Sequence, residues 1–464
     1  MNKDFIRPFV IVASAAVIVG VIAMVIPAKD SGIIKIKKMN WFERLGRTDE
    51  VSKADTLIAA EAATLASDLI PIKPFIDKLK DNSSNLRIAY FGDSIIEGDL
   101  ITGKLRQDLQ ASHGGSGVGL VPITSIVSGF RQTIKHSFSK NWESISFMTP
   151  GNSNTSLGFT GFTFIPRNYY VSEAAIEPQK LDSLAVMDSS LVATPKPREK
   201  KTRYYVSYSP WVEYTAAPVA GGATSFSRIR LFYSNATDSS IVKVSLDGAP
   251  MQSRRLKSGT GVQVLQLNDS SQIKKIKLEF SAHDPIHVYG LSFDEPKGAY
   301  VDNFPIRGYS GMYFQRIHSD ILRDFQHFLN YDLIVLQYGE NVSNPKLTDY
   351  SYYEKGMKKT IKHIQDALPG VPILMISAHD RSIKINGSYH TSPDIPYLVK
   401  TQSNVAKAMN TGFWNLFAAM GGIDSMPSYV SHQPAWAGKD YTHFTKSGGI
   451  QIAKMLLQYL QGTS

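Results

Sequence analysis

The sequence predicts an α/β protein in which a three-layer α/β/α domain with a parallel sheet is interrupted by an inserted antiparallel β-sandwich and preceded by a transmembrane helix. Three observations carry this prediction. Short apolar runs near residue 90 and after residue 330 are followed by helical patterns, and strands that alternate with helices form parallel sheets covered on both faces. The chain between them is rich in short alternating runs, and the first residues include a long charge-free apolar segment.

The apolar segment Phe9–Ile26 contains no charged residue and follows Lys3 and Arg7. It is long enough to cross a hydrocarbon core, which takes about 17–25 residues, and longer than the apolar part of a cleavable signal, about 7–15 residues. We therefore assign residues 1–28 to a signal anchor or transmembrane segment, with a cleaved signal peptide as the alternative. A single N-terminal span before a large domain usually exports it, so we expect the folded body outside the cytoplasm, in the periplasm or at the cell surface.

Residues 29–85 are predicted to form a linker and a membrane-proximal helix. Apolar residues recur at three- and four-residue spacing from Asp49 to Leu69, which is the pattern of an amphipathic helix, and Pro71 ends it.

The α/β domain is predicted from two separated segments, residues 86–121 and 297–464. Leu86–Phe91 is typical of a buried strand, and Gly92-Asp93-Ser94 leads directly into a predicted helix over 95–109. The later segment contains further predicted strands at 332–336 and 372–377, and predicted helices at 350–368, 395–409 and 447–460.

Residues 122–296 are predicted to form the inserted sandwich. Short alternating runs recur there with turn signals such as Asp247-Gly248, which is typical of antiparallel sheets. The runs interpreted as strands are 203–208, 228–233, 241–246, 262–267, 276–280 and 287–293. Residues 172–201 have few aromatic residues and several Pro, Glu, Lys and Ser, which predicts a mobile loop.

Composition excludes several classes of function. The absence of cysteine excludes a disulfide scaffold, a thiolate metal site and a cysteine nucleophile. The 50 basic against 40 acidic residues give a net charge of +10, but the excess is scattered and forms no stripe for nucleic acid. No acidic or histidine cluster has metal-ligand spacing and no Gly-rich phosphate loop follows a strand, so we expect no metal, no nucleotide, no other cofactor and no nucleic-acid partner.

Ser94 is the candidate nucleophile because it lies where the first strand turns into the predicted helix. Open α/β sheets bind ligands at the carboxyl ends of their strands, and a helix N-terminus would favour negative charge developing near the Ser94 N–H. A Gly-Asp-Ser alone is weak evidence, since Asp93 or Ser94 could simply be a helix N-cap.

Three further motifs follow in order along the chain: Gly308-Tyr309-Ser310-Gly311, Tyr338-Gly339-Glu340-Asn341 and Asp440-Tyr441-Thr442-His443-Phe444. Together with Phe91-Gly92-Asp93-Ser94 they resemble the four blocks of the GDSL-type, or SGNH, serine hydrolases over about residues 86–117 and 303–460. The resemblance implies an SGNH fold and a serine esterase activity. One departure is Val342, which stands where the family often has an Asp after its Gly-x-Asn.

The chemistry of acyl transfer assigns a role to each matched residue. Ser94 Oγ would attack an ester carbonyl, His443 would act as general base, and Asp440 would hold the other nitrogen of the imidazole. The oxyanion would be bound by the Ser94 N–H, the Gly311 N–H and the Asn341 side-chain amide. Each such donor typically stabilises the transition state by about 2.7–4 kcal/mol.

Other candidates receive other interpretations. Gly308 is the alternative to Gly311 as the second oxyanion donor, although Gly311 is in the register of the family. Asp324-Phe325-Gln326-His327 repeats the Asp-x-x-His spacing but lies in a predicted helix over 316–329, where a solvated or capping pair is expected. His379 is expected to be a surface or structural residue, and Asp380-Arg381 to form an ion pair that shapes a loop rather than to contact substrate.

The insert makes the resemblance more specific, because it points to one group of SGNH proteins. An SGNH domain split by a sandwich, with Val301-Asp302-Asn303-Phe304 leading back into the Gly308–Gly311 loop, is similar to envelope peptidoglycan O-acetylesterases and related polysaccharide-modifying proteins. This similarity implies an O-acetylated glycan as the substrate. Aromatic residues of the insert such as Trp211, Tyr214 and Tyr233 are expected to be packing residues, and no substrate-binding residue is predicted.

Three functions are consistent with the sequence. The first is an exported serine esterase that removes O-acetyl groups from a cell-envelope or extracellular polysaccharide through an acyl-enzyme. The second is an O-acetyltransferase that uses the same triad on a glycan, and the third is a non-catalytic carbohydrate-binding envelope protein. The complete set of nucleophile, base and Asn disfavours the third, whereas the first two form the same acyl-enzyme and differ only in the acceptor.

Overall fold

The computed structural model describes residues 68–81, 85–149, 155–167, 169–172, 203–206, 209–282 and 284–462. The chain divides into two compact units, Met1–Ala63 and Thr64–Ser464, and all of the described residues belong to the second. The predicted anchor at 1–28, nearly all of the helix predicted over 49–69 and most of the loop predicted over 172–201 lie outside the described residues. No helix in the described ranges combines the length and apolar character needed to cross a membrane.

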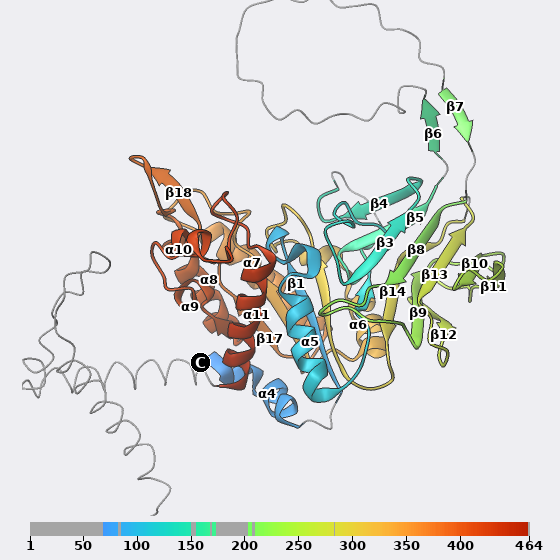
Figure 1. The fold of residues 1–464 in the computed structure, drawn as a ribbon, viewed down its shortest axis with the longest axis horizontal. Coiled ribbons are helices and arrows are strands. Elements are labelled where there is room, and N and C mark those ends of the chain that lie inside the picture. Colours follow the sequence, from blue (N-terminus) through green and yellow to red (C-terminus); the bar gives the residue numbers. More distant parts are fainter. Residues whose placement is uncertain are drawn as a thin grey trace, which may run out of the picture. The chain divides into compact units, whose positions relative to one another are not determined.

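A five-stranded parallel sheet in the order β15-β1-β16-β17-β20 forms the centre of the α/β part (Figure 1). Its strands are β1 (Leu86–Gly92), β15 (Ala299–Pro305), β16 (Leu333–Gln337), β17 (Ile373–Ile376) and β20 (Gly412–Trp414). Because β1 pairs with β15 on one side and β16 on the other, the segment before the insert is held between two strands that follow it. Within the described residues, no strand of the insert joins this sheet.

Helices cover both faces of the parallel sheet, because successive residues of a strand point to opposite sides. Ala89 and Phe91 of β1 belong to a core that includes α6, α7 and α8, whereas Ile88 and Tyr90 belong to a second core with α4, α5, α10 and α11. Figure 1 shows α5 and α11 next to each other, and they are in contact. The helices are α4 (Lys73–Lys80), α5 (Thr102–His113), α6 (Ser319–Leu329), α7 (Ser351–Ala367), α8 (Ile395–Met409), α9 (Leu416–Ala419), α10 (Met426–Ser431) and α11 (Lys446–Gln461). This is the predicted three-layer arrangement.

The insert forms two antiparallel sheets, in the orders β11-β10-β13-β8-β3 and β12-β9-β14-β5-β4, with β2 also paired to β14. Their facing sides share one hydrophobic core, to which β8 and β13 contribute Val212 and Leu278, and β9 and β14 contribute Leu231 and Leu291. The insert is therefore a β-sandwich. Its strands are β2 (Gly119–Val121), β3 (Ile134–Phe138), β4 (Trp142–Ser146), β5 (Phe162–Pro166), β8 (Trp211–Ala216), β9 (Arg228–Ser234), β10 (Ile241–Leu246), β11 (Gln252–Arg255), β12 (Gln263–Asn268), β13 (Lys275–Phe280) and β14 (His287–Asp294). Two separate strand pairs are β6 (Tyr169–Ser172) with β7 (Arg203–Val206), and β18 (Ser382–Ile385) with β19 (Ser388–Thr391).

The sandwich is packed against the α/β part rather than standing apart from it. The Phe325 ring of α6 stacks on Phe232 of β9 with 5.2 Å between ring centroids, and meets Tyr289 of β14 edge-on at 5.6 Å. Tyr214 and Tyr233 are buried packing residues, as predicted, whereas Trp211 is partly exposed. The insert and the helices of one face therefore share a continuous core.

Two details differ from the sequence-based expectation. The segment 86–121 was assigned to the α/β domain, but β2 at its end pairs with β14 of the insert, so the part that joins the parallel sheet ends earlier. The single helix predicted over 95–109 is wrong. A short 3-10 segment, η3 (Ser94–Asp99), is broken at Glu97 and Gly98, and α5 begins only at Thr102.

The break has a local cause. Gly98 and Asp99 have φ values of +70° and +62°, in the left-handed region that does not continue a right-handed helix. The buried Asp99 carboxylate accepts hydrogen bonds from Thr102, Arg106 and Thr133, which hold it in this turn. Ser94 consequently does not stand at the N-terminus of a long helix, and the predicted macrodipole contribution does not apply to it.

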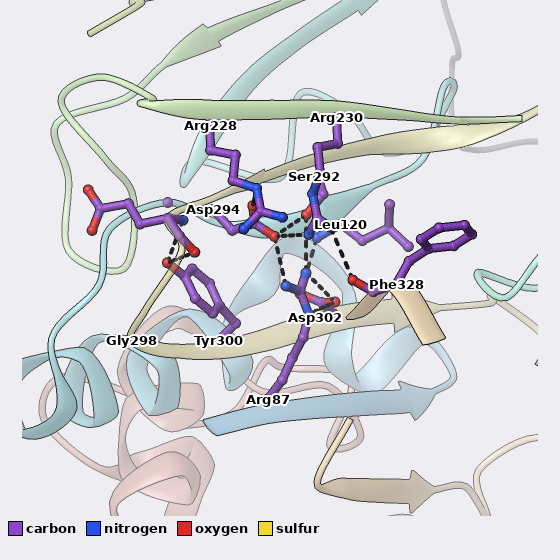
Figure 2. Close-up of polar contacts among 12 residues, drawn as sticks. Arg87, Leu120, Arg228, Arg230, Ser292, Asp294, Gly298, Tyr300, Asp302 and Phe328 are labelled. Carbon is purple, nitrogen blue, oxygen red and sulfur yellow. Dashed lines mark hydrogen bonds and ion pairs between the residues drawn. The ribbon is translucent and has the colours of Figure 1, made fainter. Parts of the chain in front are cut away.

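A buried ion-pair network joins β1 to the insert (Figure 2). Arg87 of β1 donates from Nη1 to Asp294 Oδ2 of β14 at 2.8 Å and from Nε to Asp302 Oδ2 of β15 at 2.9 Å. Arg230 of β9 donates to the same Asp294 oxygen at 2.6 Å. Burial raises the pKa of Asp294, but Arg87 and Arg230 outweigh this effect and hold that pKa below its ordinary value. The network thus joins the parallel sheet to the insert through buried charges.

We expect Arg87→Met to lower the free energy of unfolding by about 3–5 kcal/mol, because it leaves two buried carboxylates without their main partner. Urea denaturation of the full-length protein measures this change. The matched control is Lys362→Met, which removes an exposed i,i+4 pair with Asp366 whose side chains are 65% and 60% exposed, and its effect should stay below about 1 kcal/mol. Similar small losses in both variants would show that the network does not stabilise the fold.

Candidate active site

Ser94, His443 and Asp440 form a continuous hydrogen-bonded chain. Ser94 Oγ lies 3.0 Å from His443 Nε2, and His443 Nδ1 lies 2.7 Å from Asp440 Oδ2. Both distances are within the range of about 2.6–3.2 Å that proton transfer between a nucleophile and its base requires. Ser94 and His443 are 349 positions apart in the sequence, so tertiary folding alone brings them together.

The turn that carries His443 is shaped by its own residues. Asp440 Oδ1 accepts hydrogen bonds from the backbone N–H groups of Thr442 and His443, both at 3.1 Å, as in turns in which an Asp side chain bonds the backbone ahead of it. Tyr441 between them has a φ of +54°, and its ring stacks on Tyr389 of the β18–β19 hairpin with 3.5 Å between centroids. Two local bonds and one stacked ring thus hold His443 toward Ser94.

Asp440 is poised to hold the imidazole as a carboxylate. Burial raises the pKa of Asp440, but the hydrogen bonds that it accepts from the His443 ring and from the two backbone N–H groups outweigh burial, so its pKa lies below the ordinary value. An ionised Asp440 accepts a hydrogen bond from His443 Nδ1–H, which leaves Nε2 as the acceptor for the Ser94 hydroxyl.

Gly311 has a backbone N–H that is free within the described part of the chain, as an oxyanion donor needs, and it occupies a position that only glycine can fill. No acceptor for its N–H lies among the residues that the structure describes, and its carbonyl accepts a hydrogen bond from Thr360 Oγ1 at 3.0 Å. Its φ of +86° and the Tyr338 ring, 2.6 Å from where a Cβ would stand, admit only glycine. Gly308 also has a positive φ, but the nearest atom to its Cβ position is 3.4 Å away. A side chain at Gly308 would therefore meet less steric hindrance than one at Gly311.

The Asn341 amide is close to the site but already engaged. Asn341 Nδ2 lies 3.0 Å from Asp93 Oδ2 and 3.2 Å from the Tyr309 carbonyl oxygen. Both hydrogens of the amide therefore have acceptors. For Asn341 to bind an oxyanion, its amide must give up the hydrogen bond to the Tyr309 carbonyl and donate to the substrate instead.

Asp93, which the sequence suggested only as a possible cap, has a second contact in the candidate site. It does cap the turn, since its Oδ1 accepts from the Ile95 N–H at 3.0 Å, but its Oδ2 also orients Asn341. Burial raises the pKa of Asp93 to about 7, so it lies close to ionisation at neutral pH. No local pattern indicates this role, because Asn341 approaches from a distant turn.

A second link joins the Ser94 turn to the loop that carries Gly311. Arg307, just before Gly308, forms a two-point ion pair with Glu97 of η3. Glu97 is 3% exposed, whereas the Arg307 side chain is 53% exposed. The turn with the nucleophile and the loop with the expected oxyanion donor are thereby tied together.

The other Asp-x-x-His does not belong to the site. Asp324 Oδ2 accepts a hydrogen bond from the Val262 N–H of the insert at 3.0 Å, and His327 lies in the last turn of α6. As expected, the spacing alone does not make a triad.

His379 and Asp380 are internal residues rather than surface residues. Asp380 is fully buried and accepts hydrogen bonds from Thr391 Oγ1 at 2.7 Å and from the Met426 N–H at 2.6 Å, so it shapes the surrounding loops. His379 is 2% exposed, which excludes the surface interpretation. The Arg381 Nε lies 4.0 Å from Glu340 Oε2, so the ion pair expected for Asp380-Arg381 is instead a contact of Arg381 with Glu340.

The site is open to solvent on the side of the base. The His443 and Asp440 side chains are 43% and 52% exposed, so a bulky substrate can approach them. A cleft of 320 Å³ adjoins the Ser94 turn, lined by Glu97 and Arg307 from the α/β part and by residues such as Met148 and Phe162 from the insert.

Comparison of the sequence with family models and with curated proteins gives no match. Among solved structures, a peptidoglycan O-acetylesterase covers 84% of this chain and 95% of its own length, with a TM-score of 0.61 and 22% sequence identity. A family two carbohydrate esterase from Cellvibrio japonicus covers 56% of this chain and 91% of its own, with a TM-score of 0.24 and 12% identity. A lipase/acylhydrolase from Enterococcus faecalis covers 36% and 77%, with a TM-score of 0.26 and 17% identity.

The first of these likenesses shows a common fold over most of both chains. The chain thus shares its fold, a parallel α/β domain with a β-rich insert, with that peptidoglycan O-acetylesterase, and the four motifs that resemble those of SGNH hydrolases lie within this fold. More particularly, the likeness extends over 84% of this chain, so it includes residues of both the α/β part and the insert.

We expect Ser94 to react covalently with a fluorophosphonate probe, because the base is already in hydrogen-bond contact with its hydroxyl. Asp440→Asn should slow labelling by orders of magnitude, since the same change in a serine-protease triad costs about 10⁴-fold. Mass spectrometry of the labelled peptide measures the rate. His327→Ala is the matched control and should label at the wild-type rate, and wild-type labelling of the Asp440→Asn variant would show that Asp440 does not activate Ser94.

Proposed function

We propose that this protein is an exported serine esterase that removes O-acetyl groups from a cell-envelope or extracellular polysaccharide through an acyl-enzyme intermediate. The observation that carries the proposal is the Ser94–His443–Asp440 chain, with contacts of 3.0 and 2.7 Å, at the end of the first strand of the parallel sheet. A hydroxyl is a weak nucleophile, and a base in contact with it is the arrangement that activates it.

The reaction proceeds in two displacements. Ser94 Oγ attacks the acetyl carbonyl carbon while His443 Nε2 takes the hydroxyl proton, and the oxyanion is bound by the backbone N–H of Ser94, the N–H of Gly311 and the Asn341 amide. The intermediate collapses and expels the sugar alkoxide, which receives the proton from His443. Water then attacks the acetyl-enzyme by the reverse of these proton movements and releases acetate and free Ser94.

Two features support a glycan as the source of the acetyl ester. A base whose side chain is 43% exposed can reach an ester on a long polymer, which a closed pocket could not admit. A solved structure whose likeness covers 84% of this chain is a peptidoglycan O-acetylesterase.

The same triad also supports an O-acetyltransferase as a second candidate. The acetyl-enzyme is common to both reactions, and the exposure of His443 admits a sugar hydroxyl as readily as water. The complete triad argues against the non-catalytic carbohydrate-binding protein, because a binding protein needs neither the base nor its carboxylate partner.

The function is tested by acetate release from a panel of O-acetylated glycans, with and without a non-acetylated glycan acceptor. We expect release of acetate by the wild-type protein and its loss by orders of magnitude in Ser94→Ala, which removes only the nucleophile. His327→Ala should match the wild type. Acetate release that persists in Ser94→Ala would exclude the serine mechanism, and transfer to the acceptor in preference to water would favour the transferase.

We further propose that Phe9–Ile26 anchors the protein in a membrane with its folded body outside the cytoplasm. The length and charge-free character of this segment support the proposal. In expressing cells, the full chain should resist alkaline extraction from membranes and be digested by protease added outside the inner membrane. Deletion of residues 1–28 should release it, and full protection from the protease would place the body in the cytoplasm.

A further inference from the structure

Glu340 is a buried acid that the proposed mechanism does not use. It lies between Gly339 and Asn341, on the turn that carries the Asn341 amide, and its side chain is 7% exposed. Within the described residues, neither carboxyl oxygen has a hydrogen-bond partner that meets ordinary geometric limits. A buried group of this kind calls for a physical explanation, since burial of an unpaired carboxylate is costly.

The nearest polar group is the equally buried His379. Its Nδ1 lies 3.3 Å from Glu340 Oε1, and its Nε2 lies 2.8 Å from the carbonyl oxygen of Thr442, the residue before His443. A carbonyl oxygen only accepts, so Nε2 carries the hydrogen, and Nδ1 of a neutral imidazole is then an acceptor.

An acceptor nitrogen and a carboxylate oxygen at this separation would repel each other, whereas a carboxylic acid can donate to that nitrogen. Burial lowers the pKa of His379 to about 4, which disfavours the imidazolium. Burial also raises the pKa of Glu340 to about 7, which favours the carboxylic acid. Burial therefore favours the neutral acid form of Glu340, whose Oε1 lies 3.3 Å from His379 Nδ1.

The charges around Glu340 act in both directions. Arg381, with its Nε 4.0 Å from Oε2, and a protonated His443 favour the carboxylate, whereas Asp380, Asp394 and Asp93 favour the neutral acid. Burial is the largest of these effects and sets the direction of the pKa.

We propose that Glu340 is a positioning residue for the general base: its carboxylic acid donates to His379 Nδ1, and the His379 Nε2–H in turn holds the Thr442 carbonyl, which fixes the peptide that carries His443. This proposal rests on the proposed esterase function. It couples the turn that bears Asn341 to the turn that bears the base, although Glu340 touches neither substrate nor Ser94.

The proposal has a pH consequence with a definite sign. Below the pKa of Glu340 the acid donates and the chain of bonds is intact. As the pH rises through about 7, the acid loses its proton, a carboxylate faces the His379 lone pair, and the support of His443 weakens. Turnover should therefore fall on the alkaline side, with KM unchanged because Glu340 is buried.

Glu340→Gln tests this consequence, because its amide donates to His379 at every pH. The ratio of kcat in this variant to wild-type kcat should rise about tenfold from pH 6 to pH 9, the size expected for one lost hydrogen bond. Glu354→Gln, which changes a half-buried acid paired with Lys358 on α7, is the matched control and should give a constant ratio. A constant or falling ratio for Glu340→Gln would overturn the proposal.

A second measurement does not depend on catalysis. In full-length Ser94→Ala protein labelled with ¹⁵N-histidine, His379 should show a protonated Nε2 and a hydrogen-bonded, unprotonated Nδ1 at pH 6, and its shifts should change as Glu340 titrates. In the Glu340→Gln variant these shifts should be constant between pH 6 and pH 9. A His379 that is protonated on Nδ1 at pH 6 would refute the positioning role even if the esterase is confirmed, whereas loss of esterase activity alone leaves this readout intact.

Discussion

The buried pairing of Arg87 with Asp294 and Asp302 is the constraint on which the rest of the structure depends. Charges in an apolar interface are tolerated only when they compensate one another, so β1, β14 and β15 must keep their mutual positions. The Asp302 carboxylate also accepts a hydrogen bond from the Leu120 N–H, which attaches β2 to the same network. Ser94 follows directly after the end of β1. The contacts of Arg87 that hold β1 against the insert therefore also fix the position of Ser94.

The site is then assembled from turns that are bonded to each other rather than from one rigid element. Glu97 with Arg307 ties the Ser94 turn to the Gly311 loop, and Asp93 ties it to Asn341. Each link joins two strand ends of the same parallel sheet, so the expected oxyanion donors and the expected nucleophile are bonded to one another. The base is supplied separately by the turn before α11, which explains why its position requires support of its own.

Periodicity predicted the regular elements well and the functional turn poorly. The helices predicted over 395–409 and 447–460 match α8 and α11. Each buries one face, and a helix with one buried face has apolar residues at three- and four-residue spacing. The predicted helix over 95–109 failed because Ile95 and Ile96 fit the same stripe while Asp99 is held in a left-handed turn. One partner of Asp99 is Thr133, at the start of the insert, and no local pattern reveals a contact at that distance.

The sequence by itself determined the four motifs, the order in which they occur, and the alternation of strands and helices, because these depend on residue type and local spacing. Only the tertiary structure decided that Ser94 and His443 lie 3.0 Å apart, that Asp93 orients Asn341, and that His379 is buried against Glu340. The physical reason is that each of these contacts joins distant segments, and that burial shifts the pKa values of Asp93, His379 and Glu340. Burial is produced by segments hundreds of residues away, which no window of the sequence contains.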